Sequence, residues 1–134
     1  MNARYEATTA GINVSVQVFY LAAQSHPAAG RFVWAYNIRL TNGGADTVQL
    51  LRRSWEITDA TGNTQLVHGP GVIGQTPILA PGESFEYTSG TPLPTESGFM
   101  TGKYHMLNLA TGVEFTIAIP AFSLDSPTEN SRRH

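Results

Sequence analysis

The sequence predicts an all-β antiparallel sandwich, in which two sheets pack face to face within a single domain. About seven short segments alternate apolar and polar residues with a period of two, and turns that contain Gly or Pro separate them. No window of about 11 residues has the apolar spacing of an amphipathic helix, so helical crossovers between parallel strands are not expected. A closed barrel is the alternative architecture that this pattern allows.

Three strands are expected in the first half of the chain, over residues 12–20, 31–41 and 47–58. The second of these places Trp34 and Tyr36 on one face, which we expect to be buried. In the third strand, Leu50 and Trp55 fall on opposite phases of the alternation. This change of phase predicts a β-bulge near Leu51.

Further strands are expected in the second half, over residues 65–68, 85–87, 100–106 and 113–119. The last two are joined by a loop and are expected to form a hairpin, while the prolines and glycines that precede them exclude a helix. The domain is assigned to residues 12–124. Residues 1–11 and 125–134 are expected to be flexible ends, because neither can bury much apolar surface.

The composition excludes several classes of protein. Hydrophobic residues make up 41% of the chain and charged residues 13%, a balance typical of a packed globule. The net charge of -2 provides no broad positive field, so no nucleic-acid partner is expected. Cysteine is absent, which excludes disulfides and thiolate metal sites. Because the sequence has neither a secretory signal nor an apolar segment of roughly 20 residues, we expect a cytoplasmic protein without membrane insertion.

The segment GPGVIG places Gly69, Gly71 and Gly74 at the G-x-G-x-x-G spacing of dinucleotide-binding loops. That mechanism needs a following helix, which Pro77 prevents, so a Rossmann-type site is rejected. Two interpretations remain. The loop amides could form a nest for a small anion, or the glycines could serve only tight turns with positive φ. We favour the second interpretation.

His68 and His105 are the candidate metal ligands, because neutral imidazoles bind borderline divalent ions. Glu83, Glu86 and Glu96 would add carboxylate oxygens. No local metal-binding spacing joins these residues, so histidines with ordinary surface or hydrogen-bonding roles are the simpler interpretation. We therefore expect weak metal binding and no cofactor.

No catalytic group is recognisable in the sequence. It contains neither a cysteine nucleophile nor a G-x-S-x-G motif, and no local context groups Ser, His and Asp. We therefore expect that the protein is not an enzyme. Arg52 and Arg53, next to Trp55, are candidates for holding an anionic partner; alternatively, their stems simply cover the sheet. Arg53, which shares a strand face with Trp55, is the one that we retain as a candidate.

Several strings together resemble the ApaG family over about residues 14–124. They are AQS (23–25), RFVWAYNIRLTN (31–42), VQLLRRSWEITD (48–59), GPGVIGQTPILAPGESFEYTSG (69–90), MTGKYHM (100–106) and IPAFSL (119–124). The resemblance implies a fibronectin type III-like or immunoglobulin-like sandwich, in agreement with the strand pattern. It also implies that the phosphate-binding role proposed for the family's glycine loop would fall on Gly69, Gly71 and Gly74. Pro70 stands where the family commonly has an acidic residue, which argues against a metal role there and removes an amide donor.

The same resemblance implies a function. The ApaG family is associated with cobalt and magnesium efflux or tolerance, has no established catalytic activity, and is similar to a domain in eukaryotic proteins that bind protein partners. We therefore expect a non-catalytic binding or adaptor domain that supports divalent-cation homeostasis through a protein partner. The alternative is a direct binder of a nucleotide, pyrophosphate or a divalent metal through the glycine-rich loop.

Overall fold

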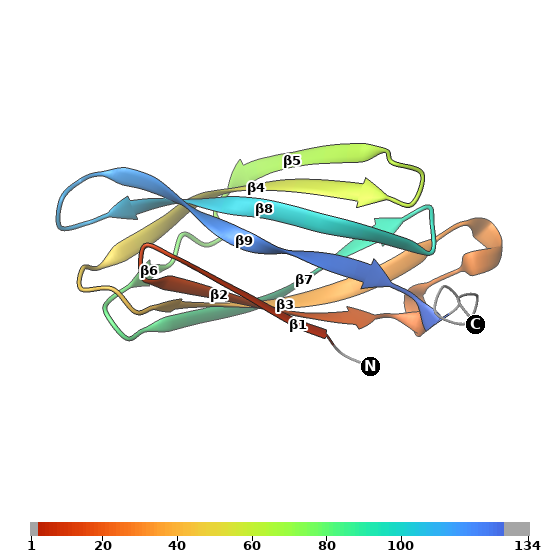
Figure 1. The fold of residues 1–134 in the computed structure, drawn as a ribbon, viewed down its shortest axis with the longest axis horizontal. Coiled ribbons are helices and arrows are strands. Elements are labelled where there is room, and N and C mark those ends of the chain that lie inside the picture. Colours follow the sequence, from red (N-terminus) through yellow and green to blue (C-terminus); the bar gives the residue numbers. More distant parts are fainter. Residues whose placement is uncertain (1–2, 128–134) are drawn as a thin grey trace.

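The computed structural model describes residues 3–127, which form the predicted sandwich of two antiparallel sheets (Figure 1). The first sheet has the strand order β1-β2-β3-β7, and the second has the order β5-β4-β8-β9. The short strand β6 pairs with β4 on the same edge as β5. The elements in chain order are β1 (Ala3–Thr9), β2 (Ile12–Tyr20), η1 (Ala22–Gln24), η2 (Pro27–Ala29), β3 (Phe32–Asn42), β4 (Val48–Asp59), β5 (Thr64–Pro70), β6 (Ile78–Leu79), β7 (Ser84–Leu93), β8 (Ser97–Asn108) and β9 (Glu114–Asp125), where η marks a single 3-10 turn.

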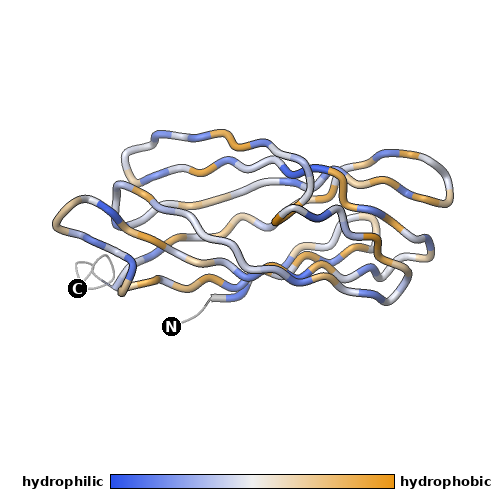
Figure 2. The backbone as a smooth tube through the Cα atoms, turned by 180° about the vertical axis from the view of Figure 1, so that it is seen from behind, coloured by the Kyte–Doolittle hydropathy of each residue, from blue (hydrophilic) through white to orange (hydrophobic). Residues whose placement is uncertain are grey.

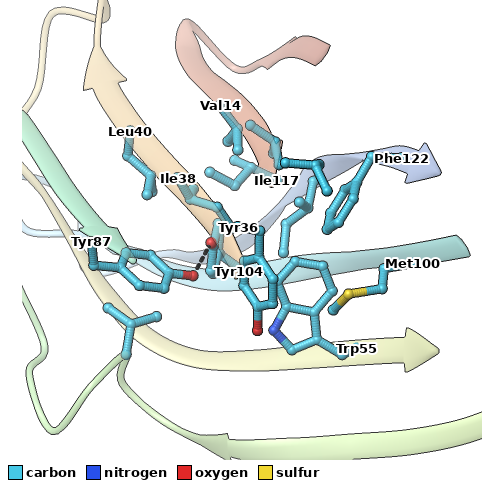
Figure 3. Close-up of a cluster of buried hydrophobic side chains, with 14 of the residues drawn as sticks. Val14, Tyr36, Ile38, Leu40, Trp55, Tyr87, Met100, Tyr104, Ile117 and Phe122 are labelled. Atoms are coloured by element: carbon cyan, nitrogen blue, oxygen red, sulfur yellow. Dashed lines mark hydrogen bonds between the residues drawn. The ribbon is translucent and has the colours of Figure 1, made fainter. Parts of the chain in front are cut away.

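The core lies between the two sheets and follows from the period-two alternation of the strands. Inward residues such as Val14 in β2 and Ile38 in β3 are fully buried, while the residues next to them are at least partly exposed. Figure 2 shows this alternation of hydropathy along the chain. In Figure 3, side chains from the first sheet meet Tyr104 of β8 and Ile117 of β9.

Three of the buried aromatic residues use their polar atoms in hydrogen bonds within the fold. The Nε1–H group of Trp34 donates to the main-chain oxygen of Asp125 at 2.8 Å, which ties β3 to the end of β9. The hydroxyls of Tyr87 and Tyr104 share a hydrogen bond that joins the two sheets (Figure 3), and burial raises the pKa of both phenols. Trp34 and Tyr36 are buried, so that prediction is confirmed.

The predicted β-bulge near Leu51 is also confirmed. The register between β4 and β8 shifts between Leu50 and Arg52, so Leu51 is an extra residue in β4. Leu50 points into the core before the bulge, and Trp55 does so after it. The shift therefore directs Arg52 and Ser54 to the outer face of the second sheet.

A second bulge lies on β9 and was not predicted. The register with β8 changes between Ile119 and Phe122, which are three residues apart and yet both buried. Pro120 lies within this segment, and a bulge is one of the few places where a strand accommodates proline. After the shift β9 continues with Leu124 buried, so it is longer than the sequence predicted.

Residues 3–9 form a strand, whereas the sequence predicted a flexible end over residues 1–11. All seven residues of β1 pair with β2. The ring of Tyr5 packs on Phe122 with the ring centroids 6.1 Å apart. This strand was missed because Tyr5 is its only large apolar residue, so the stabilising contact comes from the distant β9 and not from a local pattern.

The predicted flexible tail over residues 125–134 begins inside the domain, because Asp125 is the last residue of β9 and Ser126 is buried. Residues 1–2 and 128–134 lie outside the described residues. Among residues 3–127, no helix is long and apolar enough to cross a membrane.

Candidate functional site: the outer face of the second sheet

A hollow of about 890 Å³ lies on the outer face of the second sheet and is lined by residues of β4, β5, β8 and β9. Because alternate residues of a strand point to the same face, the strand registers determine which side chains meet there. Three rows of neighbouring residues cross the sheet in the order β5, β4, β8, β9. The first row contains Leu66, Glu56 and Thr101, and the second contains His68, Ser54, Lys103 and Ala118. The third row contains Pro70, Arg52, His105 and Thr116.

Ser54 lies at the centre of these rows, between two histidines. Its hydroxyl oxygen is 3.1 Å from Nδ1 of His68 and 3.1 Å from Nε2 of His105. A serine hydroxyl has one proton and two lone pairs, so Ser54 can donate to at most one of the two imidazoles, and the direction of each hydrogen bond follows from the tautomer of the ring. The outward nitrogens, His68 Nε2 and His105 Nδ1, bond to no other described residue. We call Ser54, His68, Lys103 and His105 the Ser54 cluster.

Two cationic side chains flank these imidazoles. Arg52 forms an ion pair with Glu114, with Nη2 and Oε1 3.3 Å apart and both side chains more than half exposed. Lys103, the single lysine of the sequence, forms no ion pair with any residue in the described range 3–127. Burial lowers the pKa of His105, and the positive charges of Arg52 and Lys103 lower it further. The neutral imidazole is therefore favoured.

In the glycine-rich segment, the backbone groups are hydrogen-bonded within the fold. Gly71 is buried with φ of +58°, and a Cβ atom there would overlap the carbonyl oxygen of Gln75. Its amide donates to the carbonyl of Leu51 at 2.8 Å. Val72 and Gln75 exchange two backbone hydrogen bonds of 2.8 and 2.9 Å across a tight turn. Two amides of the proposed anion nest, those of Gly71 and Val72, are therefore already used within the fold.

Arg53 holds this segment at the border of the hollow. Its Nη1 atom donates to the carbonyl oxygens of Pro70 at 3.1 Å and Gly71 at 2.8 Å. Gly69 leaves room for the guanidinium group, since a Cβ atom there would lie 2.9 Å from Nη1 of Arg53. The structure therefore brings Arg53 together with Gly69 and Gly71, through carbonyl acceptors. Gly74, with φ of +77°, lies in the adjoining turn.

The two candidate metal ligands come together across Ser54, but the candidate carboxylates do not join them. Glu83 accepts a hydrogen bond from the amide of Ala80 at 2.7 Å, and Glu86 lies on β7 of the other sheet. Within residues 3–127, no group of three or more His, Asp or Glu side chains is arranged to hold a metal ion.

Ser54 and Lys103 are the residues of this face that the sequence reasoning missed, whereas Arg52 was a candidate for holding an anion. Their outward direction was available from the alternation of β4 and β8 once the bulge at Leu51 was placed. Their proximity was not, because it depends on the registers between four strands.

The fold and this face define a small antiparallel β-sandwich domain with a polar hollow on one outer face. The model of the ApaG domain matches residues 22–108 of the chain. Relatives named Protein ApaG from Rhodospirillum centenum and Paramagnetospirillum magneticum are 58% and 59% identical over 128 residues, covering 96% of this chain and 98% of theirs. The chain belongs to the ApaG domain family.

Solved structures agree with this assignment. A Bordetella pertussis protein assigned as ApaA is 46% identical, with a TM-score of 0.84 over 87% of this chain and 94% of that one. The predicted sandwich fold and the family resemblance are thus both confirmed. The C-terminal domain of wzt, at 8% identity and a TM-score of 0.55, shares the fold alone.

Proposed function

We propose that this chain is a non-catalytic binding domain that docks a protein partner on the outer face of its second sheet, along β5 and over the hollow. The observation that carries this proposal is that β5 is an edge strand. Within the described chain, β4 is its only strand neighbour, so one edge of its backbone is open (Figure 1). An open edge accepts an added strand from a partner.

The composition of β5 supports this use of its edge. Soluble proteins usually protect an open edge with charged side chains, whereas β5, TQLVHGP, contains no Asp, Glu, Lys or Arg. Leu66 is 60% exposed and forms an apolar wall of the hollow. A strand added to β5 would therefore gain backbone hydrogen bonds, its side chains would lie beside Leu66 at the rim of the hollow, and the rest of the partner would cover the hollow.

The association of the ApaG family with cobalt and magnesium tolerance supports a regulatory role in divalent-cation homeostasis, exercised in the cytoplasm through the partner. Direct metal binding is the weaker proposal, because only two imidazoles converge among residues 3–127 and three or four ligands are needed for tight binding. Direct binding of pyrophosphate or a nucleotide at Gly69, Gly71 and Gly74 is also weaker, because the fold already uses two amides of that loop.

The test compares two exposed apolar residues at different ends of the sheet. Leu66→Asp places a charge beside β5, whereas Val113→Asp, 59% exposed at the hairpin between β8 and β9, is the matched control. Each tagged variant is incubated with extracts of cells grown with and without added cobalt, and captured proteins are identified by mass spectrometry. We expect a partner that is captured by the wild type and Val113→Asp and lost with Leu66→Asp, while the melting temperatures of all three remain similar.

Capture of the same partner by Leu66→Asp and the wild type would contradict the proposed docking face. Equal loss with both variants would contradict it as well.

A further inference from the structure

The Ser54 cluster contains hydrogen-bond donors for which the described residues supply no acceptor. The ammonium group of Lys103 has three N–H groups and makes no hydrogen bond or ion pair with residues 3–127. When Ser54 donates to one neutral imidazole, the outward nitrogen of that ring carries the ring proton and is a further donor. These donors converge on one hollow, because Lys103 lies opposite Ser54 and His105 lies opposite Arg52 in the register of β4 and β8.

Arg52 adds a donor that can be shared. Its ion pair with Glu114 joins two side chains that are 52% and 59% exposed, and such pairs contribute at most about 1 kcal/mol. The guanidinium has five N–H groups, and its planar geometry matches a carboxylate. An incoming carboxylate can therefore bind Arg52 without disrupting a strong interaction.

The sign of the charge around the imidazoles favours an anion over a cation. Arg52 and Lys103 both act on His105 as positive charges, and Glu114 opposes them from β9. Glu56 lies one row away, opposite Thr101, and no described cationic group lies within ion-pair distance of it. A divalent cation at this point would meet two positive side chains and only two imidazole ligands, whereas an oxyanion would meet donors on several sides.

We propose that the Ser54 cluster and Arg52 form an oxyanion-binding subsite that receives the carboxylate of an acidic side chain from a peptide segment that lies over the hollow beside β5. This inference rests on the docking face proposed above and specifies the chemistry of the partner. His68 lies on β5 itself and Lys103 lies two strands away, about 10 Å across the sheet at ordinary strand spacing, so the segment must cross the floor of the hollow as well as contact β5.

The subsite makes binding dependent on pH. A bound carboxylate stabilises the protonated form of His105, so the pKa of this group is higher in the complex than in the free protein. Affinity therefore increases as the pH falls from 7.5 to 5.5, while the peptide carboxylate, with an ordinary pKa of about 4.3, stays ionised. The charged or titratable groups that act on His105 in the folded chain are Arg52, Lys103, Glu114 and His68.

The experiment uses two capped pentapeptides of alternating Thr and Val, one with a central Glu and the other with a central Gln, together with inorganic phosphate. Each probe is titrated into the isotope-labelled full chain, and the imidazole and backbone signals are followed by NMR. We expect the Glu peptide to shift the signals of β5 and of both imidazoles, and to bind about fivefold more tightly than the Gln peptide, the size of one favourable exposed ion pair.

Two charge-removing variants locate the effect. Lys103→Gln removes a cation from the hollow, and we expect it to abolish most of the difference between the two peptides. Arg39→Gln removes a cation from an exposed position of β3 in the other sheet, so it should preserve the difference. Both positions are exposed, so neither variant is expected to unfold the protein.

The outcomes separate this inference from the proposed function. If both peptides shift the β5 signals with equal affinity, the docking face stands and the carboxylate subsite is wrong. The subsite is also wrong if Lys103→Gln leaves the fivefold difference intact, if the Glu peptide shifts no imidazole signal at millimolar concentration, or if inorganic phosphate binds more tightly than the Glu peptide. A Glu preference that depends on Lys103 supports the subsite even if capture of the cellular partner proves insensitive to Leu66→Asp.

Discussion

The glycine-rich segment and the Ser54 cluster lie beside each other at β5, but they use their polar groups in opposite ways. In the glycine-rich segment, amides and carbonyls bond to Leu51, to Arg53 or to each other within the tight turn. In the Ser54 cluster, Lys103 and the outward imidazole nitrogens have no acceptor or donor among the described residues. Polar groups that the fold has already satisfied serve stability, and those left free are available to a ligand.

The largest loss of stability is expected from Gly71→Ala, in the glycine-rich segment. The added methyl group would overlap the carbonyl of Gln75 at a position with φ of +58°, so we expect a loss of about 2–4 kcal/mol in the free energy of unfolding. Gly74→Ala is the control, because φ is +77° there but no heavy atom lies within 4 Å, and it should cost about 1 kcal/mol. Denaturant unfolding monitored by tryptophan fluorescence measures both. Wild-type pyrophosphate binding at micromolar affinity, lost in Gly71→Ala without a change in stability, would reverse our interpretation of this segment.

A smaller effect is expected from Arg53→Gln. The variant loses two charge-assisted hydrogen bonds to the carbonyls of Pro70 and Gly71, which should lower the free energy of unfolding by about 1–2 kcal/mol. Amide hydrogen exchange of Gly71 and Val72 should become faster, because these groups lie in the segment that Arg53 holds. Unchanged exchange and unchanged stability would show that Arg53 is not a structural clamp and would return it to the candidate ligand-binding residues.

The smallest effect is expected in the titration of His105. Burial and the charges of Arg52 and Lys103 lower its pKa below the ordinary histidine value of 6.5, so the folded state disfavours protonation. The resulting contribution to stability is present above pH 6.5 and declines as the pH falls below that value. Lys103→Gln should raise the pKa of His105, as measured by NMR titration of the imidazole signals. A pKa that stays the same in this variant would place Lys103 too far away to belong to the cluster.

The core strands could be predicted from the sequence because each carries its own period-two signal. Trp34, Tyr36 and the bulge at Leu51 are examples in which the local pattern alone determined which face is buried. β1 could not be found in this way, because the packing of Tyr5 on Phe122 joins opposite ends of the chain.

In the candidate site, too, local features could be predicted from the sequence and contacts between distant strands could not. The G-x-G-x-x-G spacing was visible because it is local, and its positive φ angles at Gly71 and Gly74 agree with the turn interpretation. The meeting of His68 and His105 at Ser54 was invisible, because it depends on the registers of β5 and β8 with β4. A shift of one residue in either register would move one of these histidines to the opposite face.

The contact between β1 and β9 affects how this molecule can assemble. The amide of Ala118 donates to the hydroxyl of Thr9 at 3.2 Å, and the amide of Ser123 donates to the hydroxyl of Tyr5 at 3.4 Å. Side chains of β1 thus occupy donors on β9, at the edge of the second sheet opposite β5. Growth of a fibre by edge pairing needs two receptive edges in each sheet, whereas a sheet with one receptive edge closes after a single addition. The second sheet can therefore recruit one strand at β5 without becoming a template for polymerisation.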